Sequence, residues 1–135
     1  LTILTGNSAS GLGDLLDRLS ADGVDIRAHC LVDNGDENCK LRMIVSEPER
    51  AVSILERRNV AVVVNEVLMV ETDDKPGGLS RLLDLFGEQD VPIEYSYTAA
   101  SGRPGVAVMV FRFSDNQKAA DVFEKNGVKL LGDTA

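Results

Sequence analysis

The hydrophobic positions of the chain change period several times, and each change predicts a new element. Apolar residues recur at the three- and four-residue spacing of an amphipathic helix in two places, Leu12, Leu15, Leu16 and Leu19, and Leu79, Leu82, Leu83 and Phe86. Apolar residues take alternate positions, as in strands with one buried face, in the sets Ile26, Ala28, Cys30 and Val32; Cys39, Leu41, Met43 and Val45; Ile93, Tyr95 and Tyr97; and Ala107, Met109, Phe111 and Phe113. The pattern therefore predicts a mixed α+β chain.

Turn and cap residues predict where these elements end. Asp33-Asn34-Gly35-Asp36 is typical of a two-residue type I′ hairpin turn between the first pair of alternating runs. Two segments have the spacing of a capping box and predict the start of a further helix, Ser46 to Glu49 and Ser114 to Gln117. Ala51 and Leu55 would face the core on the first of these helices, as Ala119 and Phe123 would on the second.

The same order of elements occurs twice. Eight residues recur 67 positions later, where roughly two would match by chance: Thr5/Thr72, Gly11/Gly78, Leu12/Leu79, Leu15/Leu82, Leu16/Leu83, Asp17/Asp84, Val24/Val91 and Ile26/Ile93. The offset then becomes 68, as in Ser46/Ser114 and Val60/Val128, so the extra residue falls in the predicted hairpin loop. The sequence therefore predicts two tandem ferredoxin-like βαββαβ modules, residues 1–66 and 67–135, with antiparallel sheets and helices on one face.

Charge and composition narrow the classes of partner. The formal net charge is −8, and the densest basic run is Arg57-Arg58, which argues against nucleic acid and anionic membranes. The longest apolar stretches, Val60 to Val64 and Val67 to Val70, are too short to span a bilayer, and no export signal is apparent. Cys30 and Cys39 lack the spacing of a metal or redox motif. We expect a cytoplasmic protein with reduced thiols, no metal and no cofactor.

One strand of the second copy is apolar on both faces. Val106, Val108 and Val110 alternate with the residues expected in the core. A two-layer sandwich would leave this second face in water, so either the sibling module or a second chain must cover it. We expect a homodimer.

The segment from Asp73 to Leu79 carries the strongest functional signal. Pro76 presets a helical backbone angle at a helix start, and Asp74 is placed to cap the free amides. Gly77 and Gly78 remove side chains from the first turn, which would open the backbone N–H groups to a carboxylate. The alternative is a well-capped helix whose glycines serve close packing. Gly11 occupies the place of Gly78 in the first copy, so the position is expected to need a bare backbone in both.

These motifs resemble the ACT domain, a module of βαββαβ order. The resemblance lies in Asp-Asp-Lys-Pro-Gly-Gly-Leu after the first strand of copy two and in Val91-Pro92-Ile93-Glu94-Tyr95 at the second strand. Small stand-alone proteins of two ACT domains share the tandem arrangement. The resemblance implies modules that associate through their sheets and bind a free amino acid between them.

The resemblance also implies which residues contact the ligand. In copy two they are Asp74, Lys75, Pro76, Gly77, Gly78 and Leu79, with Ile93, Glu94 and Tyr95 as the opposing wall. In copy one they are Asn7, Ser10, Gly11 and Leu12, with Ile26 and Arg27. Copy one departs from the pattern, because Ala9-Ser10-Gly11 replaces Pro76-Gly77-Gly78.

No arrangement of residues predicts catalysis. His29, the one histidine, has no acid or nucleophile placed with it, and alternation puts it on the outer sheet face beside Arg27. The sequence therefore predicts a regulatory protein that senses a free amino acid, not an enzyme. The alternative is a regulatory or assembly subunit that docks on an amino-acid biosynthetic enzyme and has no small ligand of its own.

Overall fold

The chain folds into two compact units, each with its own sheet. The structure, a computed structural model, describes residues 1–132. Module 1 is Leu1–Asn65, and module 2 begins at Glu66. The two residues at the junction form hydrogen bonds within different modules. Thr2 Oγ1 donates to Asn65 Oδ1 at 2.8 Å, whereas the Glu66 carbonyl accepts from Arg112 Nη1 and Asn116 Nδ2, each at 2.9 Å.

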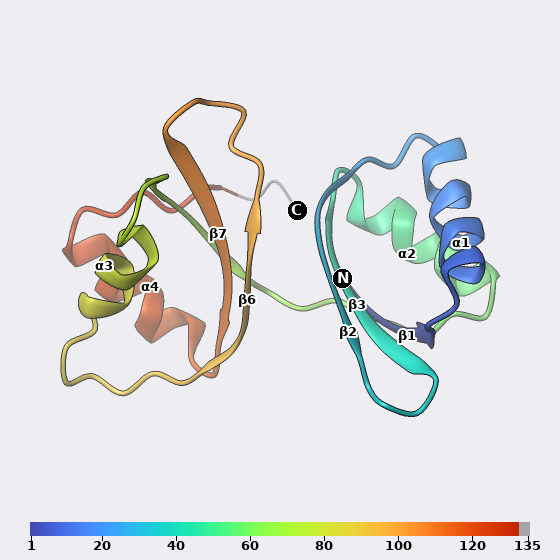
Figure 1. Ribbon diagram of the computed structural model, residues 1–135, viewed down its shortest axis with the longest axis horizontal. Helices are drawn as coiled ribbons and strands as arrows, with labels where there is room; N and C mark the ends of the chain where they lie inside the picture. The colour runs from blue at the N-terminus through green and yellow to red at the C-terminus, as the bar shows by residue number, and fades with distance from the viewer. Residues whose placement is uncertain (133–135) are drawn as a thin grey trace. The chain divides into compact units, whose positions relative to one another are not determined.

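Module 1 has the βαββαβ order predicted from the sequence. Its elements are β1 (Thr2–Gly6), α1 (Ala9–Ala21), β2 (Ile26–Asp33), β3 (Asn38–Val45), α2 (Pro48–Arg57) and β4 (Val62–Val63). The strands form one antiparallel sheet in the order β2-β3-β1-β4, and both helices lie on one face of it (Figure 1). This order defines the ferredoxin-like sandwich.

Module 2 repeats the architecture with a reduced last strand. Its elements are β5 (Leu68–Asp73), α3 (Gly78–Asp84), β6 (Ile93–Ala99), β7 (Val106–Phe113) and α4 (Asn116–Lys125). The sheet order is β5-β7-β6, and α3 and α4 lie on one face (Figure 1). Beside β5, a single bridge between Val70 and Leu130 takes the place of a fourth strand. The predicted α+β fold of two tandem modules is therefore confirmed.

Each module buries its own core between the sheet and its two helices. Ala51 and Leu55 of α2, and Ala119 and Phe123 of α4, are fully buried, as predicted from their spacing. The core of module 1 is aliphatic, with Ile3, Leu19 and Met43 among its members. The core of module 2 is aromatic and includes Phe86, Phe111, Phe113 and Phe123, whose ring centroids lie 5.3–6.0 Å apart.

A β-bulge near the start of β2, and another near the start of β6, overturns part of the predicted alternation. The register shifts between Ile26 and Ala28 and again between Ile93 and Tyr95. A one-residue shift moves every later side chain to the other face of the strand. Ala28, Cys30 and Val32 therefore lie on the face away from the helices, where they pair with Ile44, Arg42 and Lys40. His29, which was expected on the outer face, pairs with the core residue Met43. Tyr95 and Tyr97, which were expected to face the core, pair with Arg112 and Val110.

The first hairpin is longer than the predicted two-residue turn. Asp33 pairs with Cys39, and the Asn34 amide donates to the Asn38 carbonyl at 2.9 Å, so residues 34–37 form the loop between β2 and β3. Gly35 and Glu37 both have positive φ, at 84° and 66°. Cys30 therefore lies opposite Arg42, whereas a two-residue turn would place it opposite Cys39, and both thiols are free.

Neither predicted capping box forms. The side chain of Ser46 instead accepts from the Asp25 amide at 2.9 Å, and α2 begins without a side-chain cap after Glu47. At α4 the cap is Asp115, whose carboxylate accepts from the Lys118 amide at 3.0 Å. In both cases the helix begins one residue later than the spacing suggests, so the serine lies outside the first turn.

Candidate functional site

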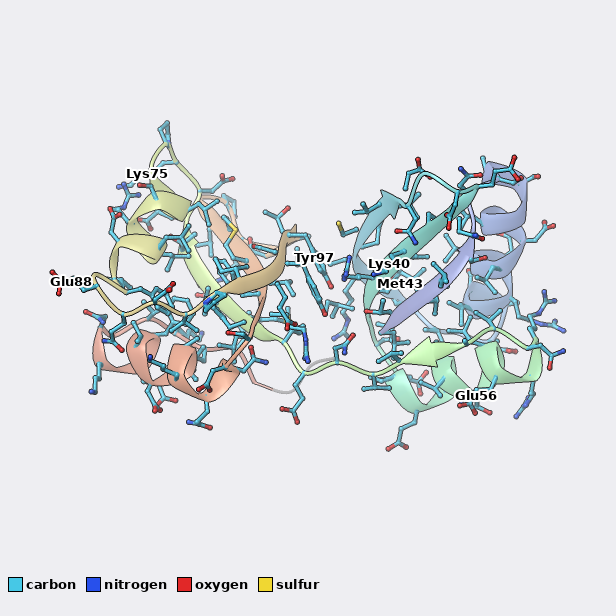
Figure 2. The ribbon with its side chains drawn as sticks, turned by 90° about the horizontal axis from the view of Figure 1, so that it is seen from below. Lys40, Met43, Glu56, Lys75, Glu88 and Tyr97 are labelled. Carbon is cyan, nitrogen blue, oxygen red and sulfur yellow. The ribbon has the colours of Figure 1, made fainter. Side chains whose placement is uncertain are left out.

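The loop between β5 and α3 is held by its own backbone. Asp73 ends β5 opposite Val106, and the amide of Asp74 donates to the Gly105 carbonyl at 3.0 Å. The Lys75 amide donates to Asp73, and the Gly78 amide donates to the Lys75 carbonyl at 3.1 Å. These bonds fix a tight turn before the helix. Lys75 projects from the outer bend of this turn (Figure 2).

Gly77 makes the entry into α3 possible. It is the N-cap residue and has φ of 87°, in the left-handed region that favours glycine. The helix has no side-chain cap, so the prediction that Asp74 caps it is wrong. Pro76 precedes the N-cap and does not occupy the first helical turn, and its carbonyl accepts from Arg81 Nη1 at 3.4 Å. A left-handed glycine replaces the expected proline-and-aspartate start.

Gly78 is required for packing. It is buried, and a Cβ atom there would lie 2.5 Å from the Asp73 carbonyl oxygen. Because its amide already donates to Lys75, the Gly78 N–H is not open to a ligand carboxylate. At Gly11 the nearest atoms to a Cβ belong to Ser8, at 3.9 Å, so the expectation of a bare backbone in both copies is wrong. Of the two interpretations of this loop, close packing accounts for Gly78.

An open groove of about 670 Å³ lies beside the loop and α3. Its volume falls in the range of roughly 300–1,000 Å³ that is typical of small-molecule sites. Five of the predicted ligand contacts line it, namely Asp74, Lys75, Gly77, Gly78 and Leu79. The rest of the lining consists of residues that were not predicted as ligand contacts: Asp73, Ser80, Leu83, Asp84, Ala107 and Met109.

The apolar part of the groove contains two exposed leucines. Leu79 is 44% exposed and Leu83 is 37% exposed. Their counterparts in α1, Leu12 and Leu16, pack against the core of module 1. Identical residues at identical positions thus support the core in one module and border a groove in the other. Periodicity alone could not reveal this difference, because the leucine spacing of the two helices is the same.

The charged part of the groove lies mostly at its loop end. Among the described residues that line the groove, Lys75 is the one cation, against Asp73, Asp74 and Asp84. Lys75 Nζ lies 3.6 Å from Asp73 Oδ2, and both side chains are more than half exposed. An exposed pair of this kind contributes little to folding, so both groups remain available to a charged ligand.

The second predicted wall lies at the other end of module 2. Ile93 pairs with Phe113 at one end of β7, whereas Asp73 pairs with Val106 at the other. Seven residues of extended strand separate these ends by roughly 23 Å. Ile93, Glu94 and Tyr95 therefore do not line the groove within their own module. Glu94 instead binds Arg112 Nε at 2.8 Å, and Tyr95 stacks on Tyr97 with ring centroids 6.3 Å apart.

The predicted contacts of module 1 are similarly divided between the two ends of its sheet. Asn7 and Ser10 are exposed beside Gly11 near the start of α1, and Asn7 Nδ2 donates to Asp33 Oδ1 at 3.4 Å. Leu12 and Ile26 pack against the core, and Arg27 is exposed at the bulge in β2. A groove on this module lies farther along α1 and has a mostly charged lining, Asp14, Asp17, Arg18, Ala21 and Arg58.

Two features of residues 1–132 concern other classes of function. Within residues 1–132, no group of three or more His, Cys, Asp or Glu side chains is placed to hold a metal ion. No helix in that range has both the length and the hydropathy needed to cross a bilayer.

The fold and groove define a class: duplicated ferredoxin-like modules, with a tight glycine turn before the first helix of the second module. Residues 1–134 match the family described as an ACT domain pair, and the chain belongs to that family. ACT domains are regulatory modules, so the chain is a protein of the regulatory, small-molecule-binding type.

One solved structure shows the same tandem fold, and a second matches at a lower score. Protein BT0572 from Bacteroides thetaiotaomicron is 29% identical to this chain, with a TM-score of 0.87 over 96% of this chain and 88% of that one. An unknown protein from Galdieria sulphuraria is 15% identical, with a TM-score of 0.39 over 96% of this chain and 93% of that one. Among curated proteins, no relative matches this chain.

Proposed function

We propose that this protein is a regulatory sensor that binds a free amino acid in the groove beside Asp73–Leu79 and performs no chemistry of its own. The observation that carries the proposal is the pairing, in one groove, of Lys75 and Asp74 with the exposed side chain of Leu79. A zwitterion needs a cation, an anion and an apolar surface, and the groove offers all three. Membership of a regulatory family supports the same proposed function.

The ligand's role is to change the protein's preference between two states of assembly. A ligand shifts such an equilibrium only by the difference in its affinity for the two states. Ile93, Glu94 and Tyr95 lie far from the groove of their own module, so they can form its second wall only as part of a second chain. The proposal therefore includes a site that a second chain completes.

A homodimer is part of this proposal. Val106, Val108 and Val110 lie on the face of β7 away from the core phenylalanines, beside Tyr95 and Tyr97. Light scattering at micromolar concentration should give twice the 14.5 kDa mass of the chain. Val108 is already only 4% exposed in the single chain, so Val108→Lys should destabilise module 2 as well as weaken the assembly, because it forces an unpaired charge into an apolar contact. A monomer at the same concentration would contradict the proposed homodimer.

The direct test of ligand binding is a thermal-shift screen with each of the twenty free amino acids. A ligand that binds only the folded protein raises the apparent melting temperature. Stabilisation by one amino acid or a related group supports the sensor. If none stabilises the protein and an amino-acid biosynthetic enzyme co-purifies with it, the chain is instead a docking subunit without a small ligand.

A further inference from the structure

The groove of module 2 differs from the corresponding surface of module 1 in a way that selects among ligands. Leu79 and Leu83 form an apolar strip on α3 that no core residue covers, and Ala107 and Met109 continue it on β7. In module 1 the matching leucines are used in packing. Covering exposed leucines of this kind with an apolar group is favourable, because it removes apolar surface from water.

Three of the four charged residues that line the groove lie toward one end of this strip and give the groove a direction. Asp73, Asp74 and Lys75 occupy the loop before α3, whereas Leu83 lies one helical turn beyond Leu79. The ammonium and carboxylate of an amino acid are joined to one carbon, so both must bind at the same end. Lys75 suits the carboxylate and Asp74 suits the ammonium. The side chain of the ligand then extends along the leucines.

We infer that the ligand is an amino acid with an aliphatic or thioether side chain, bound by its zwitterionic head at Asp74 and Lys75 and by its side chain on Leu79, Leu83 and Met109. The inference rests on the proposed function and names the ligand class for that site. Asp84, at the far end of α3, adds a negative charge there and disfavours acidic side chains.

Leucine and asparagine provide the sharpest pair of probes, because their side chains have nearly the same shape and differ in polarity. We expect calorimetry to show L-leucine binding at least tenfold more tightly than L-asparagine, a difference of about 1.4 kcal/mol. Removing either charged group of the head should also weaken binding at least tenfold, tested with 3-methylbutylamine and with 4-methylpentanoate.

Variants of the two modules give a matched control. Leu83→Ala should weaken leucine binding by five- to tenfold, whereas Leu16→Ala, at the same position of module 1, should leave it within twofold. Leu79→Ala repeats the first test at a residue whose side chain is 44% exposed, should Leu83→Ala perturb the fold. Circular dichroism of each variant establishes that it is folded.

The possible outcomes separate this inference from the function on which it rests. If asparagine, lysine or glutamate binds as tightly as leucine, the side-chain assignment is overturned while the sensor stands. Equal loss of leucine affinity in Leu83→Ala and Leu16→Ala also overturns it. If none of the twenty amino acids binds at millimolar concentration, the proposed function fails, and this inference fails with it.

Discussion

The first helices of the two modules begin from the same leucine spacing and end as different structures. α1 runs from Ala9 to Ala21, with Ser8 as its N-cap and Leu12 and Leu16 against the core. α3 runs only from Gly78 to Asp84, and its equivalent leucines are exposed. After Asp84 the chain continues in tighter turns, in which the amide of Phe86 donates to Leu83 and that of Gly87 to Asp84.

The difference supports the proposal that one copy of the duplicated fold binds the ligand. Both modules keep the inner leucine of the first helix, Leu15 or Leu82, at less than 8% exposure. Packing therefore needs that residue in both. In module 2 the outer pair, Leu79 and Leu83, does not belong to the core, which contains phenylalanines instead. A surface that would otherwise support folding becomes available to a ligand.

The largest contrast between the modules is expected at the two equivalent glycines. Gly78→Ala should destabilise module 2 by about 1–3 kcal/mol, because its Cβ would meet the Asp73 carbonyl and force the backbone to move. Gly11→Ala should stabilise module 1 by about 0.5–1 kcal/mol, because the site is open and alanine favours the helix. Urea unfolding measures both changes, and effects of the same sign would break the comparison.

The two modules can be followed separately during unfolding. Tyr95 and Tyr97 are the two tyrosines of the chain, both lie in module 2, and there is no tryptophan. Tyrosine fluorescence therefore reports on module 2, while far-ultraviolet circular dichroism reports on both.

The outer leucines should differ next in their effect on stability. Leu16→Ala should cost about 1–2 kcal/mol, less than the 2–5 kcal/mol of a fully buried leucine, because Leu16 is only partly covered. Leu83→Ala should cost less than about 1 kcal/mol, since its side chain contacts solvent. A larger loss in Leu83→Ala than in Leu16→Ala, measured by the same urea unfolding, would mean that α3 packs as α1 does.

The smallest contrast concerns pH. Glu71 of β5 occupies the place of Leu4 in module 1, and a hydrogen bond from Arg103 holds its pKa below the ordinary value, with Lys129 contributing. A carboxyl whose pKa is depressed in the folded state stabilises above its ordinary pKa and loses that stabilisation as pH falls through the folded value. The loss should be modest, because the pair is partly solvated.

Tyrosine-monitored urea unfolding between pH 6 and pH 3 measures this effect. As the pH falls, the urea midpoint should fall more steeply in the parent protein than in Glu71→Gln, which cannot titrate at this position. Identical slopes would show that the Glu71–Arg103 pair contributes nothing to module 2.

The sequence predicts the fold well because the pattern of each element occurs twice along the chain. The elements β3 and α2 reappear at the same bounds 68 residues later, as β7 and α4. The bulges could not be predicted, because alternation counts every residue and cannot show that Arg27 and Glu94 stand out of register. The prediction of the two capping boxes was wrong for a related reason. A serine that lies one residue outside the first turn gives the same sequence pattern as a serine at the N-cap.

The candidate site is predicted in part. The glycine turn and its neighbours were evident from Asp74 to Leu79, and these residues line the groove except Pro76. Leu83, Ala107 and Met109 could not be found from the sequence, because their periodicity is that of core residues. Only the exposure of the α3 leucines, set by how this short helix packs, reveals their place in the groove.

The central claim is that module 2 alone has become a binding module, and an NMR titration of the ¹⁵N-labelled protein with L-leucine tests it most directly. We predict one saturating site per chain. Amide shifts should concentrate at residues 73–84 and around Met109, and the equivalent residues 6–17 should stay unchanged. Equal shifts at both sets of residues, with two leucines bound per chain, would show that the modules are alike in function and would contradict the account.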